Sequence, residues 1–242
     1  MQASRQPLSR DRVLIESLHI ADHEGVSAVT MRRVAAGLGV EAMALYRHVP
    51  AKEQLLDGLI ERVVAEVESA IGDPQPGEDW DVALRRRCLT AREVMVRHRW
   101  APGLIGSRTT IPPDLYRYFE AVLATLINGG FSYHLAHQAI HALGSMVLGF
   151  TQELFGPAAG GDNSDHDDAE ADLVAMAEVL PHIAAMVASE LHDNQEDPLG
   201  WCDSQAEFEF TLGLLLDGLH RHRDATNAVT RQRQKRERPR SR

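Results

Sequence analysis

Apolar residues recur at the spacing of an amphipathic α-helix along nearly the whole chain. Leu14, Leu18 and Ala21 mark a first helix that Ser9 would cap, and an apolar stripe from Leu55 marks a longer one. Further helices are predicted at residues 79–99, 112–128, 132–155, 171–192 and 204–222. No run of alternating apolar and polar β-branched residues is long enough to predict a strand, so the expected fold class is all-α.

Two short helices around a tight turn are predicted between residues 25 and 52. Thr30 is a good N-cap for the first of them, because its hydroxyl can accept a hydrogen bond from an unpaired backbone amide. Gly39 can adopt the left-handed backbone conformation that ends this helix, and Leu45 would pack the second helix against the first. A helix-turn-helix of this kind presents one helix to a DNA groove, although the same spacing also occurs as plain packing in all-α domains.

The charge pattern favours DNA binding over plain packing. Residues 30–52 hold four Lys or Arg against one acid, in a chain whose formal net charge is −10. A local positive surface on an acidic protein allows approach to phosphate. Residues 1–70 as a whole hold eight Lys or Arg against ten acids. The positive surface is therefore expected to be a patch and not the whole domain.

Three short motifs resemble the DNA-binding domain of the tetracycline-repressor (TetR) family. They are Thr-Met-Arg-Arg-Val-Ala from Thr30, Leu-Gly-Val from Leu38, and Leu-Tyr-Arg-His-Val from Leu45 with Lys52 three residues further on. A weaker resemblance to the C-terminal domain of the tetracycline repressor covers most of residues 78–222. The resemblance implies an N-terminal three-helix helix-turn-helix domain at residues 9–70, followed by a helical effector-binding and dimerisation domain at 78–222.

The function implied by this resemblance is a ligand-responsive repressor that binds a palindromic operator as a homodimer. Ala42, Met43 and Ala44 occupy positions that often read bases in the family, but they cannot make bidentate hydrogen bonds. Arg47 is then the expected base reader, with a phosphate contact as its alternative role. The residues expected to contact DNA are Thr30, Arg32, Arg33, Ala42, Met43, Ala44, Tyr46, Arg47, His48 and Lys52.

The same resemblance raises the question of a magnesium–tetracycline effector. Leu104 stands where the family's metal-binding His would be, Ser145 replaces a second His-bearing position, and only Glu153 keeps a carboxylate in register. With its nitrogen donors lost, the site is expected to take a largely hydrophobic or aromatic effector and no metal or cofactor. The expected effector-binding residues are Trp100, Leu104, Ser107, Arg108, Ser145, Met146, Phe150 and Glu153.

A second interpretation rests on three histidines. His134, His137 and His141 share one face of a predicted helix, at a spacing compatible with a metal ion. The alternative function is therefore a helical metal-binding or storage protein, although no carboxylate or Cys completes a ligand set within the same motif. An enzyme is not expected, because the sequence has no P-loop, dinucleotide fingerprint or nucleophile elbow.

Small residues among bulky ones characterise the segments near 132–155 and 204–222, with Gly144 and Gly213 as expected points of close approach. The family pairs two protomers there through a four-helix bundle, and operator half-sites related by a two-fold axis require two recognition helices. The expected partners are thus operator DNA, a small molecule and a second copy of the chain, and no membrane.

Two segments are expected to be disordered: Gly156 to Asp168, and a basic tail at 223–242. From Arg221 to the end, nine Lys or Arg face two acids. Such a tail can contact DNA non-specifically, be merely solvated, or screen the acidic residues 153–209. The two cysteines match no disulfide framework or metal spacing, and no signal peptide is found, so a cytoplasmic protein is expected.

Overall fold

In the computed structural model, residues 7–73, 75, 77–150, 179–190 and 204–237 are described, and these parts of the chain contain helices and no strand. The all-α prediction is therefore confirmed. The elements are α1 (Arg10–Glu24), the 3₁₀ turn η1 (Val26–Ala28), α2 (Met31–Leu38), α3 (Ala42–Leu45), α4 (Lys52–Ile71), α5 (Trp80–Arg97), α6 (Ala101–Ser107), α7 (Pro113–Asn128), α8 (Tyr133–Gly149), α10 (Pro181–Glu190) and α11 (Ser204–Glu237).

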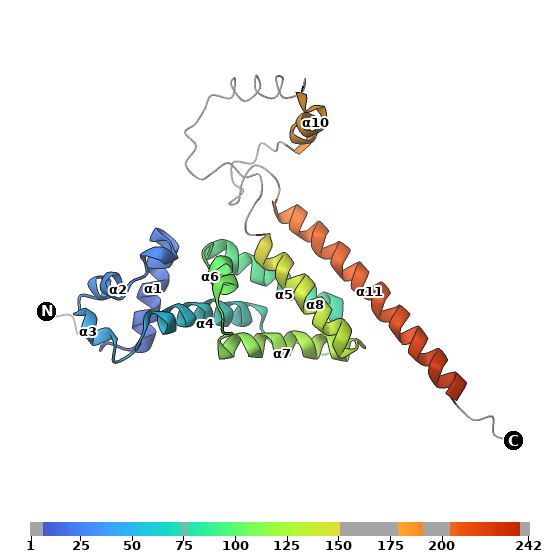
Figure 1. The fold of residues 1–242 in the computed structure, drawn as a ribbon, viewed down its shortest axis with the longest axis horizontal. Helices are drawn as coiled ribbons and strands as arrows, with labels where there is room; N and C mark the ends of the chain where they lie inside the picture. Colours follow the sequence, from blue (N-terminus) through green and yellow to red (C-terminus); the bar gives the residue numbers. More distant parts are fainter. Residues whose placement is uncertain (1–6, 74, 76, 151–178, 191–203, 238–242) are drawn as a thin grey trace.

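Helices α1 to α3 and the first half of α4 form the N-terminal unit, called the head below (Figure 1). Its predicted caps are present: Ser9 Oγ accepts from the Arg12 amide at 3.2 Å, and Thr30 Oγ1 accepts from the Arg33 amide at 3.1 Å. Gly39 has φ 65° and ψ 39°, the left-handed conformation expected from the sequence. Local sequence signals thus account for the start of α1 and for both ends of α2.

Helix α4 is shared between two hydrophobic cores. Its first half contributes Leu55, Leu59 and Ile60 to the core of the head, and its second half contributes Val63 and Val67 to the core of the C-terminal domain. Close packing of α1 on α4 depends on Gly58, because a Cβ at that position would lie 2.5 Å from Leu14 Cδ2. A single 20-residue helix therefore connects the two parts of the molecule.

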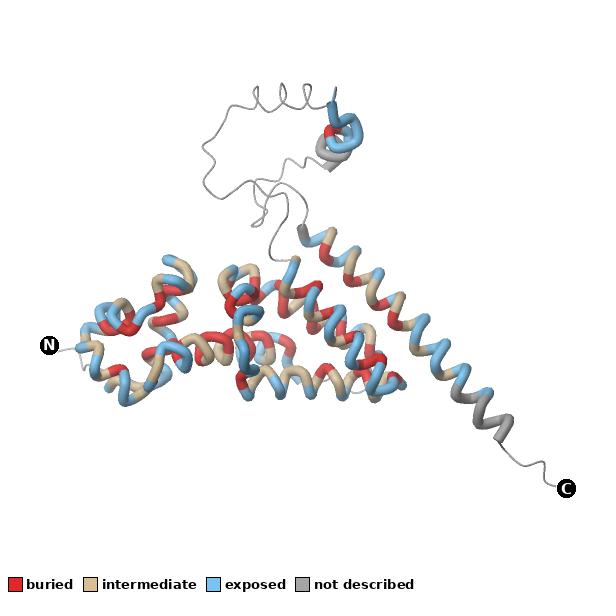
Figure 2. The backbone as a smooth tube through the Cα atoms, viewed as in Figure 1, coloured by how far each residue is buried: buried red, intermediate tan, exposed pale blue. Residues whose placement is uncertain are grey.

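The C-terminal domain packs α5, α7, α8 and α11 around the larger core. Figure 2 shows the buried residues of α5 and α8 on the sides that face their neighbours. Phe208, Leu212 and Leu216 bring one stripe of α11 into this core, with exposed fractions of 3 % or less. On other sides of α11, the apolar residues Phe210, Leu214 and Val229 are exposed.

Two features differ from the sequence-based expectations. Helix α6 was not among the predicted helices; its Pro102 lies in the first turn, where proline is tolerated. The basic segment, expected to be disordered from residue 223, continues α11 as far as Glu237. No Gly or Pro interrupts residues 223–237, and strong helix formers dominate there.

Contacts with the start of α5 and with the turn between α7 and α8 hold the continuation of α11. The Arg223 guanidinium lies 5.4 Å from the ring centroid of Trp80, and it donates to the Gly129 carbonyl at 3.3 Å. One turn later, Asn227 Nδ2 donates to the Gly130 carbonyl at 3.3 Å. The segment expected to be disordered at 156–168, together with Cys202, lies outside the described residues.

Candidate DNA-binding surface and ligand pocket

The recognition segment begins with one short turn of helix, α3, and continues as a turn through residues 46–48. Leu45 is fully buried, and its carbonyl accepts hydrogen bonds from the amides of His48 and Val49, both at 2.8 Å. Val49 is also buried. These anchors hold the segment against α2, so that side chains between them point away from the core.

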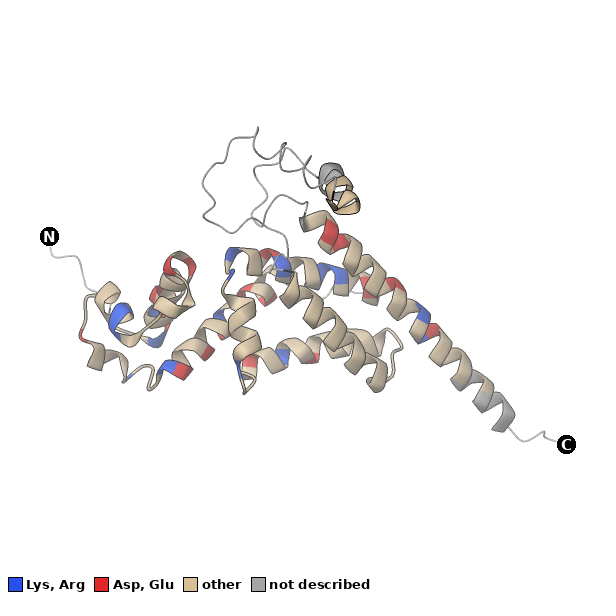
Figure 3. Ribbon diagram, turned by 45° about the horizontal axis from the view of Figure 1, so that its top comes forward, with Lys and Arg blue, Asp and Glu red and all other residues tan. Residues whose placement is uncertain are grey.

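Several residues expected to contact DNA lie on this outer surface. Met43 and Tyr46 are 73 % and 42 % exposed. Arg32, Arg47 and Lys52 are also exposed, and none of the three forms an ion pair with another described residue. Figure 3 shows Lys and Arg positions, in blue, on the N-terminal unit. Their charges are available to a polyanion such as DNA.

The other residues expected to contact DNA are partly buried or already form a hydrogen bond within the protein. Thr30 is exposed but its hydroxyl caps α2, while Ala42 and Ala44 are half-buried. His48 is half-buried and lines a polar cleft together with Asp57 and Glu61. A contact between any of these four residues and DNA stays a prediction.

Arg33 forms an ion pair within the head. Its Nε lies 3.1 Å from Glu24 Oε2, and its Nη2 contacts the other carboxylate oxygen. This hydrogen bonding holds the pKa of the Glu24 carboxyl below its usual value and raises the pKa of Arg33. The pair links α1 to α2, so a phosphate contact by Arg33, which also stays a prediction, would compete with Glu24.

Four of the expected effector residues lie at the boundary between the head and α6. Trp100 Nε1 donates to Asp22 of α1, Leu104 is buried in the core of the head, and the Ser107 hydroxyl donates to the Leu104 carbonyl. Arg108 Nη2 lies 2.6 Å from Asp57 Oδ1. Each of the four thus already has contacts within the protein.

The remaining expected effector residues lie on or after α8. Ser145 is exposed, Met146 is buried in the larger core, and Phe150 packs edge-on against Phe208 with 5.5 Å between ring centroids. Glu153 lies outside the described residues. The role of these residues in effector binding stays a prediction. An apolar cavity lies in another part of the C-terminal domain.

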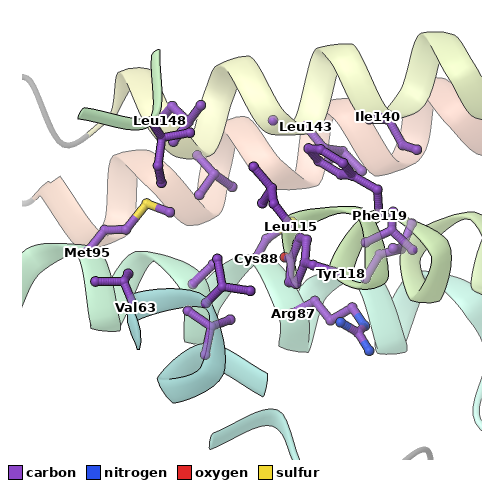
Figure 4. A pocket seen from close by; sticks show the side chains of 18 residues that line it. Val63, Arg87, Cys88, Met95, Leu115, Tyr118, Phe119, Ile140, Leu143 and Leu148 are labelled. Carbon is purple, nitrogen blue, oxygen red and sulfur yellow. The ribbon is translucent and has the colours of Figure 1, made fainter. Parts of the chain in front are cut away.

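An apolar cavity of about 120 Å³ lies between α4, α5, α7 and α8 (Figure 4). None of the expected effector residues that the structure describes lines it. Its lining residues are Val63, Val64, Val67, Leu84, Arg87, Cys88, Ala91, Met95, Ile105, Leu115, Tyr118, Phe119, Val122, Ile140, Leu143, Gly144, Val147 and Leu148.

Few polar groups belong to this cavity. The Arg87 guanidinium is turned away from it in Figure 4 and pairs with Glu68 at 2.9 Å. Burial raises the pKa of the Cys88 thiol to about 12, so the thiol is uncharged at neutral pH, and burial also raises the pKa of Tyr118. A ligand here would meet hydrocarbon, one thiol and one phenol, and no ionised group facing it.

Small residues in the sequence are a signal for this cavity, although the resemblance to the tetracycline repressor did not point to them. Cys88 and Ala91 are small residues on the inner face of α5, and Gly144 lies on the opposite wall in α8. Small side chains facing each other across a helical bundle leave space that larger neighbours do not fill. Recognising the signal requires knowing which helices face each other, and that is a tertiary property.

The three histidines of the metal hypothesis lie exposed on α8. His137 and His141 are adjacent, with their Nε2 atoms 3.2 Å apart. Within the described parts of the chain, no group of three His, Cys, Asp or Glu side chains is placed to hold a metal ion. Nothing favours the metal-binding alternative. Likewise, no helix among the described residues is long and apolar enough to cross a membrane.

An exposed helix-turn-helix, joined by one helix to a domain that encloses an apolar cavity, defines a DNA-binding regulator with its own ligand domain. Comparison with known families supports both parts. Residues 17–59 match the bacterial regulatory proteins of the tetR family, and residues 73–223 match the tetracyclin repressor-like C-terminal domain. The second match alone spans more than half of the chain. The chain belongs to the TetR family of transcriptional regulators.

Individual relatives agree with this assignment. The HTH-type transcriptional repressor DrrR1 of Streptomyces coeruleorubidus is 30 % identical over 88 % of this chain and 77 % of its own length. The class E tetracycline repressor of Escherichia coli is 31 % identical over 60 % of this chain and 68 % of its own length. The crystal structure of the Streptomyces coelicolor TetR family protein ActR in complex with actinorhodin has a TM-score of 0.68 and 26 % identity, covering 90 % of this chain and 99 % of ActR.

Proposed function

We propose that this regulator is a repressor that binds a palindromic operator as a homodimer and releases it when a largely apolar, aromatic small molecule enters the cavity. The supporting observation is the double role of α4. Val63, Val64 and Val67 line the cavity, while Leu55 and Leu59 of the same helix support the helix-turn-helix. In this proposal the repressor acts in the cytoplasm, where the operator DNA is, and catalyses no reaction.

In this proposal the operator is released because α4 carries both the cavity wall and the head. A ligand shifts a conformational equilibrium only by as much as it prefers one state over the other. An effector that pushes on the Val63 side of α4 would favour a tilted helix, and the head would tilt with it because both are packed on that helix. The two heads of the dimer must fit half-sites about 34 Å apart, and tilting changes the spacing between them so that they no longer fit both half-sites.

The lining of the cavity supports the proposed chemical class of the effector. Its walls are hydrocarbon, and a volume of about 120 Å³ accommodates a group close to the size of one aromatic ring. A larger molecule would have to displace a flexible part of the wall, such as Phe119 on α7. ActR, which resembles this chain over most of its length, is described in complex with actinorhodin, and this supports an aromatic effector here.

The proposal is tested by a gel shift on DNA upstream of the gene, followed by titration with a panel of neutral aromatic compounds. We expect a shifted complex without ligand and its loss with at least one member of the panel. Matched aliphatic acids should have no effect, since the one cation in the described lining, Arg87, is already paired with Glu68. A complex that forms but is released only by the acids would contradict the proposed effector class.

Tetracycline with magnesium should not release the operator. The cavity lining contains no His, and Leu104, which stands at the position of a metal-binding His, is buried in the core of the head. Magnesium prefers oxygen ligands at near-octahedral geometry, which hydrocarbon walls do not supply. Fluorescence anisotropy of labelled operator should stay constant when tetracycline is added with magnesium chloride. Release that disappears on addition of EDTA would show this prediction to be wrong.

Dimerisation is expected through the outer faces of α8 and α11. Phe210 and Leu214 of α11 are 68 % and 56 % exposed, and Gly213 lies beside them. A Cβ at Gly213 would meet only the Arg85 guanidinium, at 4.0 Å, so the single protomer has room there. Replacing Gly213 with Leu should therefore spare the protomer but weaken the dimer by about 1–3 kcal/mol if the partner packs closely there.

Sedimentation velocity over a range of protein concentrations measures this effect. The Gly213→Leu variant should dissociate at higher concentrations than the wild type, while circular dichroism remains the same. A matched change, Ala124→Leu on the exposed side of α7, should leave the dissociation constant unchanged. A wild-type protein that stays monomeric at micromolar concentration, also when bound to DNA, would contradict the symmetric arrangement.

A further inference from the structure

Three residues connect α5 to α6, and the side chains of two of them, His98 and Trp100, contact the head. His98 ends α5, and Trp100 immediately precedes α6. His98 is 6 % exposed, although it is flanked by two charged residues, Arg97 and Arg99. Trp100 packs against both hydrophobic cores. This segment is therefore placed between the ligand domain and the DNA-binding unit, as α4 is.

One carboxylate of the head holds both side chains. Trp100 Nε1 donates to Asp22 Oδ1 at 2.7 Å, and His98 Nδ1 lies 2.7 Å from the same oxygen. The other ring nitrogen of His98 lies 3.0 Å from Glu66 Oε2 on α4. Asp22 and His98 are 76 residues apart in sequence. The α5–α6 segment thus joins α1 to α4 by direct hydrogen bonds.

These contacts are of the strong, charge-assisted kind. Hydrogen bonds accepted by a carboxylate are shorter and stronger than those between two neutral groups. Arg97 adds bonds to Glu66 at 2.7 Å and to Glu93 at 2.9 Å. Although burial acts in the opposite direction, hydrogen bonds from Arg97 and His98 hold the pKa of the Glu66 carboxyl below its usual value.

The same segment is continuous with the wall of the cavity. Met95, three residues before His98, lines the cavity from α5, and Ile105, five residues after Trp100, lines it from α6. A ligand that displaces either wall moves the backbone that carries His98 and Trp100. Because Asp22 holds these side chains, the displacement is transmitted to α1 of the head.

We infer that Asp22, His98 and Trp100 are positioning residues that orient the head through α1, in parallel with α4. This inference rests on the proposed function, and names the contacts by which occupancy of the cavity reaches the DNA-binding unit. In the wild type, the three side chains hold α1 in one orientation relative to the ligand domain. Without them, the head is held by α4 alone and samples a wider range of orientations, which weakens binding to a palindrome of fixed spacing.

Removing the carboxylate tests the inference on the full-length protein without any ligand. Asp22→Ala removes the shared acceptor, and Asp22→Glu keeps a carboxylate at the same place. Asp81→Ala is the matched control, because Asp81 makes the corresponding contact to a histidine, His220 at 3.2 Å, far from the head. We expect operator affinity to fall about tenfold in Asp22→Ala, to recover to within about threefold in Asp22→Glu, and to change less than about twofold in Asp81→Ala.

Two further measurements report on the contact itself. In Asp22→Ala, the indole N–H resonance of Trp100 should shift, as assigned by its loss in Trp100→Phe, because its hydrogen bond to a carboxylate is gone. Hydrogen exchange of the α1 amides should become faster, while exchange in α8 stays as in the wild type. If Asp22→Ala matches Asp81→Ala in operator affinity, in α1 exchange and in the Trp100 resonance, the inference is wrong.

These measurements distinguish failure of the proposed function from failure of the inference. Wild-type protein that binds no operator would reject the proposed function, whereas α1 exchange and the Trp100 resonance would still test the contact. Conversely, operator binding by the wild type together with unchanged exchange in Asp22→Ala would reject the inference alone.

Discussion

Replacing Arg47 with Ala should weaken operator binding by about 1–3 kcal/mol per half-site, or roughly 5- to 150-fold for each. Arg47 is exposed in the turn that follows α3 and forms no ion pair with another described residue, so its guanidinium is available to a guanine or a phosphate. Because a dimer would use two such residues on a palindrome, the total effect should be close to twice that of one half-site. Anisotropy titrations at several salt concentrations measure both the affinity and its salt dependence.

Arg117→Ala is the matched control for this change. Arg117 is a highly exposed arginine on α7, outside the head, and its loss should leave operator affinity unchanged. Arg32→Ala, on the exposed side of α2, should weaken binding and lower the salt slope by about one per lost phosphate contact. Unchanged affinity and unchanged salt slope in both head variants would reject the assignment of this surface to DNA.

Filling the cavity should abolish the response to the effector. Ala91 lies on α5, is 3 % exposed, and lines the cavity. Ala91→Phe places a ring where the effector would bind, so we expect release of operator to need at least about a hundredfold more ligand, with operator binding itself retained. The extra volume should cost about 1–3 kcal/mol of stability, which thermal unfolding measures.

Ala124→Phe is the matched control, because it makes the same substitution on the exposed side of α7. The ligand response of this variant should match that of the wild type. A second cavity variant, Leu143→Ala, enlarges the space from α8 and should shift the preference toward bulkier aromatic compounds. If Ala91→Phe keeps the wild-type ligand response while remaining folded, the effector binds elsewhere. The residues expected from the resemblance, such as Trp100 and Phe150, would then be the next candidates.

The local architecture of the head could be predicted from sequence because its determinants are local. Thr30 caps α2 and Gly39 ends it within one short stretch of chain, and both do so in the structure as expected. The apolar stripe from Leu55 likewise identified α4. Each of these signals acts within a few residues, so side-chain chemistry and spacing are sufficient to recognise it.

The cavity and the contacts at the boundary of the head depend on distant parts of the chain. Asp22 meets His98 only because α1 and the end of α5 pack on the same side of α4. The family resemblance placed the expected effector residues on and near α6 and α8, but the side chain of Leu104 turns into the core of the head and Ser145 is exposed. Alignment carries over a position along the chain, whereas the direction of a side chain depends on packing.

The extent of α11 was misjudged for a different reason. The run of charges after Arg221 suggested a solvated tail, but charge alone does not oppose a helix when the residues are strong helix formers. Arg223 and Asn227 also have partners on the turn between α7 and α8, and the sequence offered no sign of these contacts. Composition therefore predicted disorder where a helix is formed.

The most direct test of the account is selection of DNA from a random pool by the full-length protein, followed by titration of the selected duplex. We expect a palindrome bound by two protomers through recognition segments about one DNA turn apart, with affinity lost in Arg47→Ala and kept in Arg117→Ala. Selection of no palindromic sequence, or binding that is equally strong in Arg47→Ala, would contradict the central claim that this exposed helix-turn-helix recognises an operator.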